Sequence, residues 1–289
     1  MQIDLHMHTN FSACANKSNS WQELLKKAET EKIDVLSITD HNTCAFYLED
    51  AEKVKELFSG KIISGVELDV FENGVAFELL AYDFDVKQVD KYLNKTYGTL
   101  QTRQNKLKDK LINKAKENNI KVDLDIRVGE LEYAHKCVYE NMKTFRENSQ
   151  FFEKYSINSF SDLYRLSTED KKFPLYIDVG EIFPGVNEVV SQIHKHKGIV
   201  VLAHPYNYKT NVNVEMLLQI ALESGMDGIE VFHPSASISQ IKSLLKFATK
   251  NNLLVTGGSD YHGTAMQNKI GLNAKQSKKI VDRFDSVLR

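Results

Sequence analysis

Short apolar runs that end in a histidine or a carboxylate recur along this chain of 289 residues. The first of them, Ile3–Leu5, leads directly into His6 and His8. Side chains alternate along an extended segment, so both imidazoles lie on the same side and can reach one metal ion. Repetition of this arrangement predicts a fold in which the ends of several strands meet at one site.

Six predicted strands are followed by side chains of this kind. In chain order they are His6 with His8, Asp40 with His41, Glu67, His204, His233, and Asp260 with His262. Helical patterns separate several of the strands, among them Trp21–Ala28 and Ala45–Phe58, the second with Leu48 on its inward face. Strands that alternate with helices predict a parallel α/β arrangement. Active sites of β/α barrels lie at the carboxyl ends of the strands, so we expect these side chains to share one pocket.

The alternation is interrupted after residue 67. Asn73-Gly74 joins two strand-like runs, Leu68–Phe71 and Val75–Tyr82, and is a strong hairpin signal. Residues 89–184 are rich in lysine and mostly helical in pattern, which we interpret as an inserted helical lid or subdomain. The predicted organisation is therefore a first barrel part over residues 1–88, the insertion over 89–184, and a second barrel part over 185–289.

Composition excludes several classes of protein. Lys and Arg total 37 against 39 acidic residues, so no global charge favours nucleic acid or an acidic membrane surface. No apolar run approaches the roughly 18–20 residues that span a bilayer. The three cysteines have no paired spacing, and the two early histidines stand where a signal peptide would be removed. We expect a soluble cytoplasmic protein; the sequence does not indicate its oligomeric state.

Histidines and carboxylates without paired thiolates suit Zn, Mn or Fe in a catalytic rather than a structural site. The predicted donors outnumber what one ion needs, which indicates two or three divalent ions. Such a cluster lowers the pKa of a bridging water and holds the attacking and leaving oxygens of a phosphoryl group.

Five segments carry a recognisable pattern. They are Asp4-Leu5-His6-Met7-His8-Thr9, Ile38-Thr39-Asp40-His41-Asn42, Gly65-Val66-Glu67, Leu202-Ala203-His204-Pro205 and Gly258-Ser259-Asp260-Tyr261-His262. In this order they resemble the motifs of the PHP (polymerase and histidinol phosphatase) superfamily. The resemblance implies a distorted (βα)7 TIM-like barrel and a metal-dependent phosphoesterase with a trinuclear Mn, Fe or Zn centre. It also implies a set of metal ligands: His6, His8, His41, Glu67, His204, Asp260 and His262.

The chain departs from the family pattern at two positions. Ala13 and Cys14 stand where the family usually has an Asp or His, and Cys14 is either a thiolate ligand that favours Zn or Fe, or a small loop residue. Glu78 stands where the family often has a His, and is either an oxygen ligand or an acid at a hairpin edge. Whether a third metal site is filled depends on whether Cys14 and Glu78 act as ligands.

Other residues receive more specific predictions. We expect Asp260 to bind metal and to shuttle a proton of the attacking water, and Asp40 to orient a histidine or to bind metal itself. His233 is either a phosphate contact, an acid or a rim histidine. Arg103 lies on the apolar side of a helix predicted over Gln101–Asn119, where a buried cation needs an anionic partner such as a substrate phosphate.

The sequence thus predicts a metal-dependent phosphoesterase that hydrolyses small phosphomonoesters by metal-activated water. The insertion resembles the branch of the family that acts on nucleotides and short RNA 5′ ends. Histidinol phosphate is the alternative substrate. A non-catalytic module that binds metal or nucleotide is the alternative outside enzymes, supported by Cys14 and Glu78.

Overall fold

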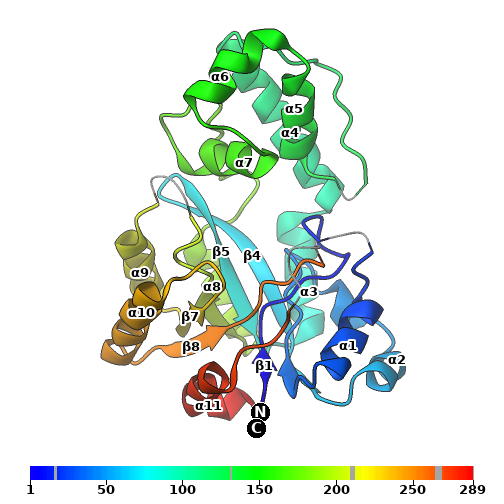
Figure 1. Ribbon diagram of the computed structural model, residues 1–289, viewed down its shortest axis with the longest axis vertical. Coiled ribbons are helices and arrows are strands. Elements are labelled where there is room, and N and C mark those ends of the chain that lie inside the picture. The colour runs from blue at the N-terminus through cyan, green and yellow to red at the C-terminus, as the bar shows by residue number, and fades with distance from the viewer. Residues whose placement is uncertain (16–17, 131, 209–211, 264–268, 289) are drawn as a thin grey trace.

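The computed structural model describes residues 1–288 except residues 16–17, 131, 209–211 and 264–268, and of residues 282–288 it describes the backbone alone. Helices and strands alternate along most of these ranges, which confirms the predicted α/β class. Figure 1 shows a lower body that contains the strands and a group of helices standing above it. None of the described helices combines the length and the apolar character that crossing a bilayer requires.

The strands form two sheets. The smaller sheet is parallel and has the order β1-β2-β3, with bounds Ile3–Asp4, Val35–Leu36 and Lys61–Ile62. The larger sheet has the order β4-β5-β6-β7-β8, with bounds Gly65–Glu72, Val75–Tyr82, Ile199–Leu202, Gly228–Phe232 and Leu254–Gly257. The strand β5 pairs antiparallel with both β4 and β6, whereas β6, β7 and β8 run parallel.

The strands β4 and β5 form the hairpin that Asn73-Gly74 predicts. Both turn residues have positive φ, 53° and 82°, as a tight two-residue hairpin turn requires. Pairing continues from Glu72 opposite Val75 to Gly65 opposite Tyr82. Glu67 therefore lies inside β4 and not beyond the end of a parallel strand. The expected position of Glu67 was wrong, because hairpin pairing extends the strand through it.

The two sheets meet at two places. Isolated parallel bridges join Met7 to Tyr261 and His41 to Glu67. At the first contact, a Cβ on Gly258 would collide with the backbone of His6, so glycine is required for the close approach of β8 to the segment after β1. The described strands nevertheless form two separate sheets and not the single closed sheet of a barrel.

Most remaining helices of the body cover the outside of the sheets (Figure 1). Their bounds are Trp21–Thr30 for α1, Ala51–Leu57 for α2, Val186–Lys195 for α8, Val214–Glu223 for α9, Ile238–Lys250 for α10 and Ala274–Leu288 for α11. The single helix predicted over Ala45–Phe58 was wrong. A short 3-10 helix, Ala45–Leu48, precedes α2, and Leu48 is 54% exposed. Asp50 interrupts the segment because its side chain caps α2 by accepting from the backbone N–H of Glu52.

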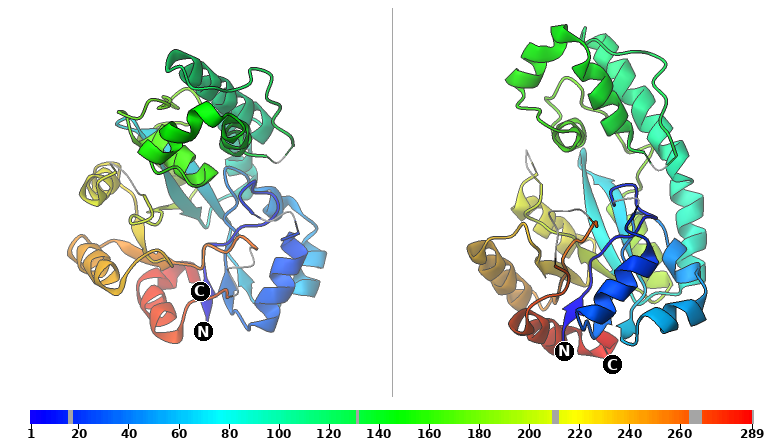
Figure 2. Two further views of the ribbon diagram at one scale, coloured as in Figure 1. Left: turned by 45° about the horizontal axis from the view of Figure 1, so that its top comes forward. Right: turned by 45° about the vertical axis from the view of Figure 1, so that its right-hand side comes forward.

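Residues 86–169 are mostly helical, as predicted for the middle of the chain. The helices are α3 (Val86–Tyr97), α4 (Leu100–Glu117), α5 (Ala134–Lys143), a 3-10 turn (Arg146–Asn148), α6 (Ser149–Lys154) and α7 (Phe160–Glu169). The helix α3 packs against α8 in the body. We call residues 100–169 the cap, because α4 leads away from the body and α5, α6 and α7 stand above the β4–β5 hairpin (Figure 2).

The core is continuous between body and cap. Buried side chains of β5 and β6 belong to the same apolar cluster as Leu107 of α4 and Leu163 of α7. A second, smaller cluster packs α1 against the first sheet through Trp21, Leu36 and Ile38. The position of the cap relative to the strand ends is therefore held by apolar packing.

Candidate metal centre

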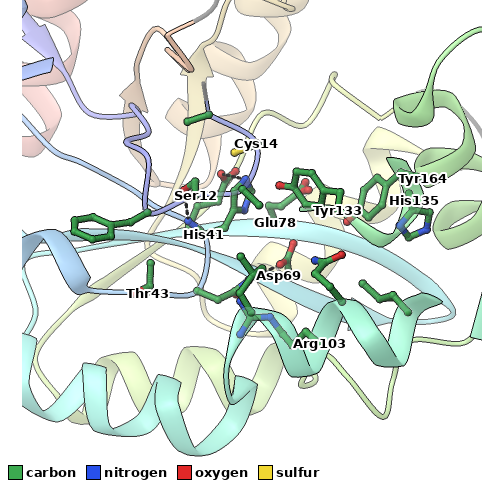
Figure 3. A pocket seen from close by; sticks show the side chains of 18 of the residues that line it. Ser12, Cys14, His41, Thr43, Asp69, Glu78, Arg103, Tyr133, His135 and Tyr164 are labelled. Carbon is green, nitrogen blue, oxygen red and sulfur yellow. Dashed lines mark hydrogen bonds and ion pairs between the residues drawn. The ribbon is translucent and has the colours of Figure 1, made fainter. Parts of the chain in front are cut away.

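A cavity of about 960 Å³ lies between the body and the cap. Its floor is formed by the loop after β1 and by strand residues, including His41, Glu67 and Glu78. Its opposite wall comes from the cap through Arg103, Tyr133 and Tyr164. Figure 3 shows Cys14 and Tyr133 directed into this space, with His41 and Glu78 beside them.

The carboxylate of Glu67 lies at the centre of the imidazoles that line the floor. Its Oε2 is 3.4 Å from Nε2 of His6, 3.3 Å from Nε2 of His8 and 3.3 Å from Nε2 of His41. Its other oxygen, Oε1, is 2.9 Å from Nε2 of His204. Four predicted residues from separate parts of the chain therefore converge on one buried carboxylate.

Asp260 closes the same group from the loop after β8. Its Oδ1 lies 3.3 Å from Nε2 of His6 and 3.2 Å from Nε2 of His8. Its backbone carbonyl accepts a hydrogen bond of 2.7 Å from Nδ1 of His262. That bond uses Nδ1 of His262, so Nε2 is the nitrogen that could bind a metal in exchange for its proton.

The donor atoms form three overlapping groups, within each of which all atoms lie within 4.8 Å of one another. The groups are His6 with His8 and Glu67; His8 with Cys14, His41 and His262; and Glu67 with Glu78 and His204. Both residues that depart from the family pattern, Cys14 and Glu78, thus lie beside predicted ligands.

The surroundings of His6 fit a bound cation. Nδ1 of His6 donates to Glu230 at 2.9 Å, so Nε2 is the nitrogen that a metal ion would use. Nε2 is buried and makes no hydrogen bond within the described residues, although carboxylate oxygens of Glu67 and Asp260 lie 3.3–3.4 Å away. Donors bound to one ion at about 2.1 Å and a tetrahedral angle are about 3.4 Å apart. A divalent ion would take the place of the Nε2 proton that these two carboxylates otherwise favour.

The ionisable groups of the cluster shift one another's pKa. Burial opposes protonation of His6, yet Glu230 and Glu67 raise its pKa well above the ordinary value. Burial disfavours the carboxylate of Glu67, but His41 and His6 hold its pKa well below the usual range. Burial, followed by the charge of His262, lowers the pKa of His8 to about 3. His8 is therefore neutral at physiological pH, as a metal ligand must be.

Glu230 is a residue that the sequence patterns did not single out. It lies on β7 with no exposed surface, and its Oε2 accepts a 2.8 Å hydrogen bond from the backbone N–H of His204. Its Oε1 receives the Nδ1 proton of His6. The inward position of an acid within the apolar run Gly228–Phe232 was the available signal, because a buried acid needs partners.

Asp40 contacts the loop after β1 instead of a histidine ring. Its carboxylate accepts hydrogen bonds from the backbone and hydroxyl of Thr9, at 2.8 and 2.6 Å, and from the hydroxyl of Ser12 at 2.6 Å. Ser12 in turn lies 3.4 Å from Nδ1 of His8 and accepts from the backbone N–H of His41 at 3.0 Å. Through Thr9 and Ser12, Asp40 thus holds the loop that contacts His8 and His41. A direct catalytic role for Asp40 remains a prediction.

His233 lies next to the acidic end of the site. Its Nδ1 accepts from the backbone N–H of Ser235 at 3.1 Å, so the proton is on Nε2, which lies 3.2 Å from Oδ2 of Asp260. The contact with Asp260 was not among the roles expected for this buried ring, and its role as a phosphate contact, an acid or a rim histidine stays a prediction.

Cys14 is surrounded by polar groups from body and cap. Its thiol is hydrogen-bonded to His41 and His262, and the hydroxyl of Tyr133 also contacts it. Burial opposes ionisation, but His262 and His41 lower the pKa of the thiol to about 7. Burial disfavours the charged form of His262 as well, and Cys14 and Asp260 raise its pKa to about 9. The arrangement therefore favours a thiolate beside two imidazoles.

Glu78 is held by two residues outside the motifs. The hydroxyl of Tyr208 donates to Oε2 of Glu78 at 2.7 Å. Arg165, on the cap helix α7, lies 3.8 Å from the same oxygen and donates to Glu169 at 3.0 Å. Sequence reasoning missed Arg165 because the contact joins residues that are far apart in the chain.

Arg103 lies on the buried side of α4, as predicted, and lines the cavity. Its Nη1 donates to the backbone carbonyls of Tyr97 and Gly98, at 3.2 and 3.0 Å. Burial lowers the pKa of Arg103, and Asp69, which lies beside it in Figure 3, partly offsets this by favouring the charged form. The guanidinium thus has protein partners, and a contact with substrate phosphate remains a prediction.

Two residues of the centre have an unusual backbone conformation. His204 has φ of 25° and Asp260 has φ of 52°, and each directly follows a strand or its short extension. Side chains other than glycine rarely adopt positive φ, and such strain costs about 1–3 kcal/mol per residue. Strain of this kind concentrates at functional sites.

Comparison with known proteins agrees with the geometry. A family model described as the PHP domain matches residues 4–160, more than half of the chain. The chain belongs to the PHP domain family.

Two characterised relatives cover most of the chain. A phosphoribosyl 1,2-cyclic phosphate 1,2-diphosphodiesterase from Eggerthella lenta is 26% identical over 90% of this chain and 94% of its own length. A 5′-3′ exoribonuclease from Haemophilus influenzae is 24% identical over 99% of this chain and 97% of its own length.

Two solved structures share the fold over nearly the whole chain. A proposed metal-dependent phosphoesterase from Bifidobacterium adolescentis has a TM-score of 0.66 and 22% identity, covering 97% of this chain and 96% of that one. An amidohydrolase from Chromobacterium violaceum, solved with bound sulfate and no metal, has a TM-score of 0.67 and 17% identity, covering 96% and 97%. At these identities the likeness establishes the fold alone.

Proposed function

We propose that this PHP-family protein, a metal-dependent hydrolase of phosphoric esters, removes phosphate from small phosphomonoesters such as a nucleotide or the 5′ end of a short RNA. The observation that carries the proposal is the convergence of four imidazoles on the buried carboxylate of Glu67, at the floor of a cavity of about 960 Å³. A cavity of this size accepts a ligand as large as a nucleotide.

The residues that we propose as metal ligands form one cluster at and directly beneath the floor of the cavity. They are His6, His8, His41, Glu67, His204, Asp260 and His262, with Cys14 and Glu78 completing the outer groups. Two or three bound divalent ions would supply Lewis acidity and a water of lowered pKa.

We assign the proton-handling role to Asp260. One of its oxygens faces His6 and His8, and the other receives the Nε2 proton of His233. His233 thereby holds the carboxylate in one orientation, from which Asp260 can accept a proton of the attacking water. Arg103 and Arg165 supply positive charge on the cap side of the cavity, where an anionic substrate would enter.

The names of the two characterised relatives favour a second candidate. Both describe cleavage of phosphodiester bonds, one of them in a cyclic phosphate. A long RNA track is not favoured by the lysines of α4, since Lys110 and Lys114 pair with Glu181 and Glu117. We therefore place a small cyclic phosphodiester second, ahead of histidinol phosphate and of a non-catalytic binding module.

We also propose that the body is the distorted (βα)7 barrel of the PHP type. The bridges Met7–Tyr261 and His41–Glu67 support this proposal, since they join the segments after β1 and β2 to the segment after β8 and to β4. In this view residues 1–88 and 185–289 form the barrel and residues 89–184 form the lid. The packing of α3 on α8 indicates that the lid proper begins after α3.

The test is phosphate release from a substrate panel, with added Mn²⁺ and with or without chelator. The panel holds nucleoside monophosphates, adenosine 3′,5′-bisphosphate, a 5′-phosphorylated short RNA, a ribose cyclic phosphate and histidinol phosphate. A phosphatase added afterwards reveals products of diester cleavage. We expect chelator-sensitive turnover of one class that is lost in His204→Ala and kept in His194→Ala, whose exposed ring pairs with Asp227 away from the cavity. A protein that binds metal but hydrolyses none of these substrates would contradict the proposal.

A further inference from the structure

The outer two donor groups of the centre differ in chemistry. One offers the sulfur of Cys14 and the imidazoles of His8, His41 and His262. The other offers two carboxylates, Glu67 and Glu78, and the imidazole of His204. Thiolate is a soft ligand that favours Zn²⁺, whereas carboxylate oxygens suit hard ions such as Mn²⁺.

We propose that the centre is heterometallic, with Zn²⁺ bound at the Cys14 group and Mn²⁺ at the Glu78 group. This inference rests on the proposed metal-dependent function and adds to it which ion each group selects. The two groups hold no residue in common, so one can be altered while the donors of the other remain.

The Cys14 group has the composition of a Zn²⁺ site. One sulfur and three ring nitrogens can supply four ligands, the number that Zn²⁺ prefers. The rings of His41 and His262 each stack on the ring of His8, with centroid separations of 4.9 and 4.3 Å. The hydroxyl of Tyr133 reaches the sulfur from the cap, and a hydrogen bond of this kind stabilises a thiolate ligand.

The Glu78 group has the composition of a hard site. The hydrogen bond from Tyr208 and the contact with Arg165 both involve Oε2 of Glu78, so Oε1 is the oxygen directed to an ion. Glu78 and Glu67 are both buried, with 6% and 1% of their surface exposed. Two buried carboxylates that share one imidazole need a cation between them to offset their repulsion.

The chain provides a matched control for the cysteine. Cys137 lies half-buried on α5 with its sulfur 3.8 Å from Glu132, and it belongs to none of the three donor groups. Cys44 is fully buried in the core. Effects specific to Cys14 can therefore be separated from general effects of thiol chemistry.

The first experiment measures ion content directly. The full chain is stripped with chelator, incubated with one equivalent of Zn²⁺ and a large excess of Mn²⁺, because most sites bind Zn²⁺ more tightly than Mn²⁺, then desalted and analysed for both metals. We expect the wild type and Cys137→Ser to retain both ions. Cys14→Asp should lose at least tenfold in Zn²⁺ affinity, and Glu78→Gln should lose Mn²⁺ while keeping Zn²⁺. An unchanged ratio of the two metals in Cys14→Asp would overturn the proposal.

The second experiment uses the wild-type protein, so its result does not depend on the folding of a variant. Zn²⁺ should protect Cys14 of the wild type from alkylation, measured residue by residue by mass spectrometry, while Cys137 stays reactive. Substitution of Co²⁺ should add a near-ultraviolet charge-transfer band from thiolate to metal. Equal alkylation of Cys14 with and without Zn²⁺, or the absence of that band, would contradict a thiolate ligand.

The outcomes separate this inference from the proposed function. If the two metals partition as expected and the substrate panel is silent, the inference survives and the proposed function fails. If turnover depends on metal but both groups take the same ion, the proposed function survives and the inference fails.

Discussion

Nδ1 of His6 and Oε1 of Glu230 lie 2.9 Å apart, and neither side chain has any exposed surface. The other oxygen of Glu230 accepts from the backbone N–H of His204. One carboxylate on β7 therefore sets the ring orientation of a histidine after β1 and the backbone position of a histidine after β6. Such partners of metal-binding histidines govern affinity nearly as strongly as the ligands themselves.

We expect Glu230→Gln to weaken metal binding by about 10–100-fold. The amide can accept from only one of its two partners, so its NH₂ group opposes either His6 Nδ1–H or the His204 backbone N–H. Titration of the stripped protein with Zn²⁺ or Mn²⁺ against a chromophoric chelator measures the change. The exposed residue Glu56 provides the control Glu56→Gln. Equal affinities in the two variants would show that the carboxylate does not orient the ligands.

Replacement of His233 distinguishes its two roles. If His233 holds Asp260 by the 3.2 Å contact, His233→Ala should lower kcat by about 10–100-fold and leave KM nearly unchanged, because proton transfer suffers and binding does not. If His233 contacts the substrate phosphate, KM should rise instead. Steady-state kinetics on the active substrate decide between them, and a thermal melt confirms that the variant is folded.

His135 predicts a pH dependence of stability that is independent of the metal centre. Burial lowers its pKa to about 3 in the folded protein, against an ordinary value of 6.5, and its Nε2 contacts Ser167 at 3.0 Å. Below pH 6.5 the unfolded chain therefore binds a proton that the folded protein does not. This difference removes about 1.4 kcal/mol of stability for each pH unit between 6.5 and about 3, and has no effect above 6.5.

The measurement is urea unfolding of the wild type and His135→Gln between pH 8 and 5. We expect the stability difference between the two proteins to be constant above about pH 6.5 and to shift in favour of the variant below it. A difference that stays constant over the whole range would mean that His135 is protonated in the folded state.

Removal of metal should destabilise the protein. Ions that bind the folded state alone stabilise it by about 2.7 kcal/mol at a free concentration 100 times Kd. The melting temperature should therefore fall on addition of chelator and recover with added Mn²⁺ or Zn²⁺. The effect should be smaller in Asp260→Asn, which loses a charged donor beside His6 and His8. The same melting temperature with and without chelator would argue against tight binding by the folded protein.

Much of the centre could be predicted because its patterns are local. The alternation of His6 and His8 follows from an extended backbone, and Asn73-Gly74 encodes a hairpin turn with positive φ at both residues. Apolar runs that end in ligand-type residues indicated which side chains meet, since parallel strands of one sheet bring their carboxyl ends together. Cys14 and Glu78 were named on a different ground, because they stand at positions where the family that the chain resembles has other ligands.

Other features depended on the tertiary structure. Glu67 was placed beyond a strand, whereas pairing with β5 carries β4 through it. Tyr133 and Arg165 have no local pattern, and the inward position of Glu230 did not show which group it would meet. Their contacts with Cys14, Glu78 and His6 join positions distant in the chain. The sequence by itself determined the donor types, the α/β class and the strand ends, because local propensity and periodicity encode them. Only strand register and cap packing decided which donors lie together, because these depend on long-range contacts that no local pattern records.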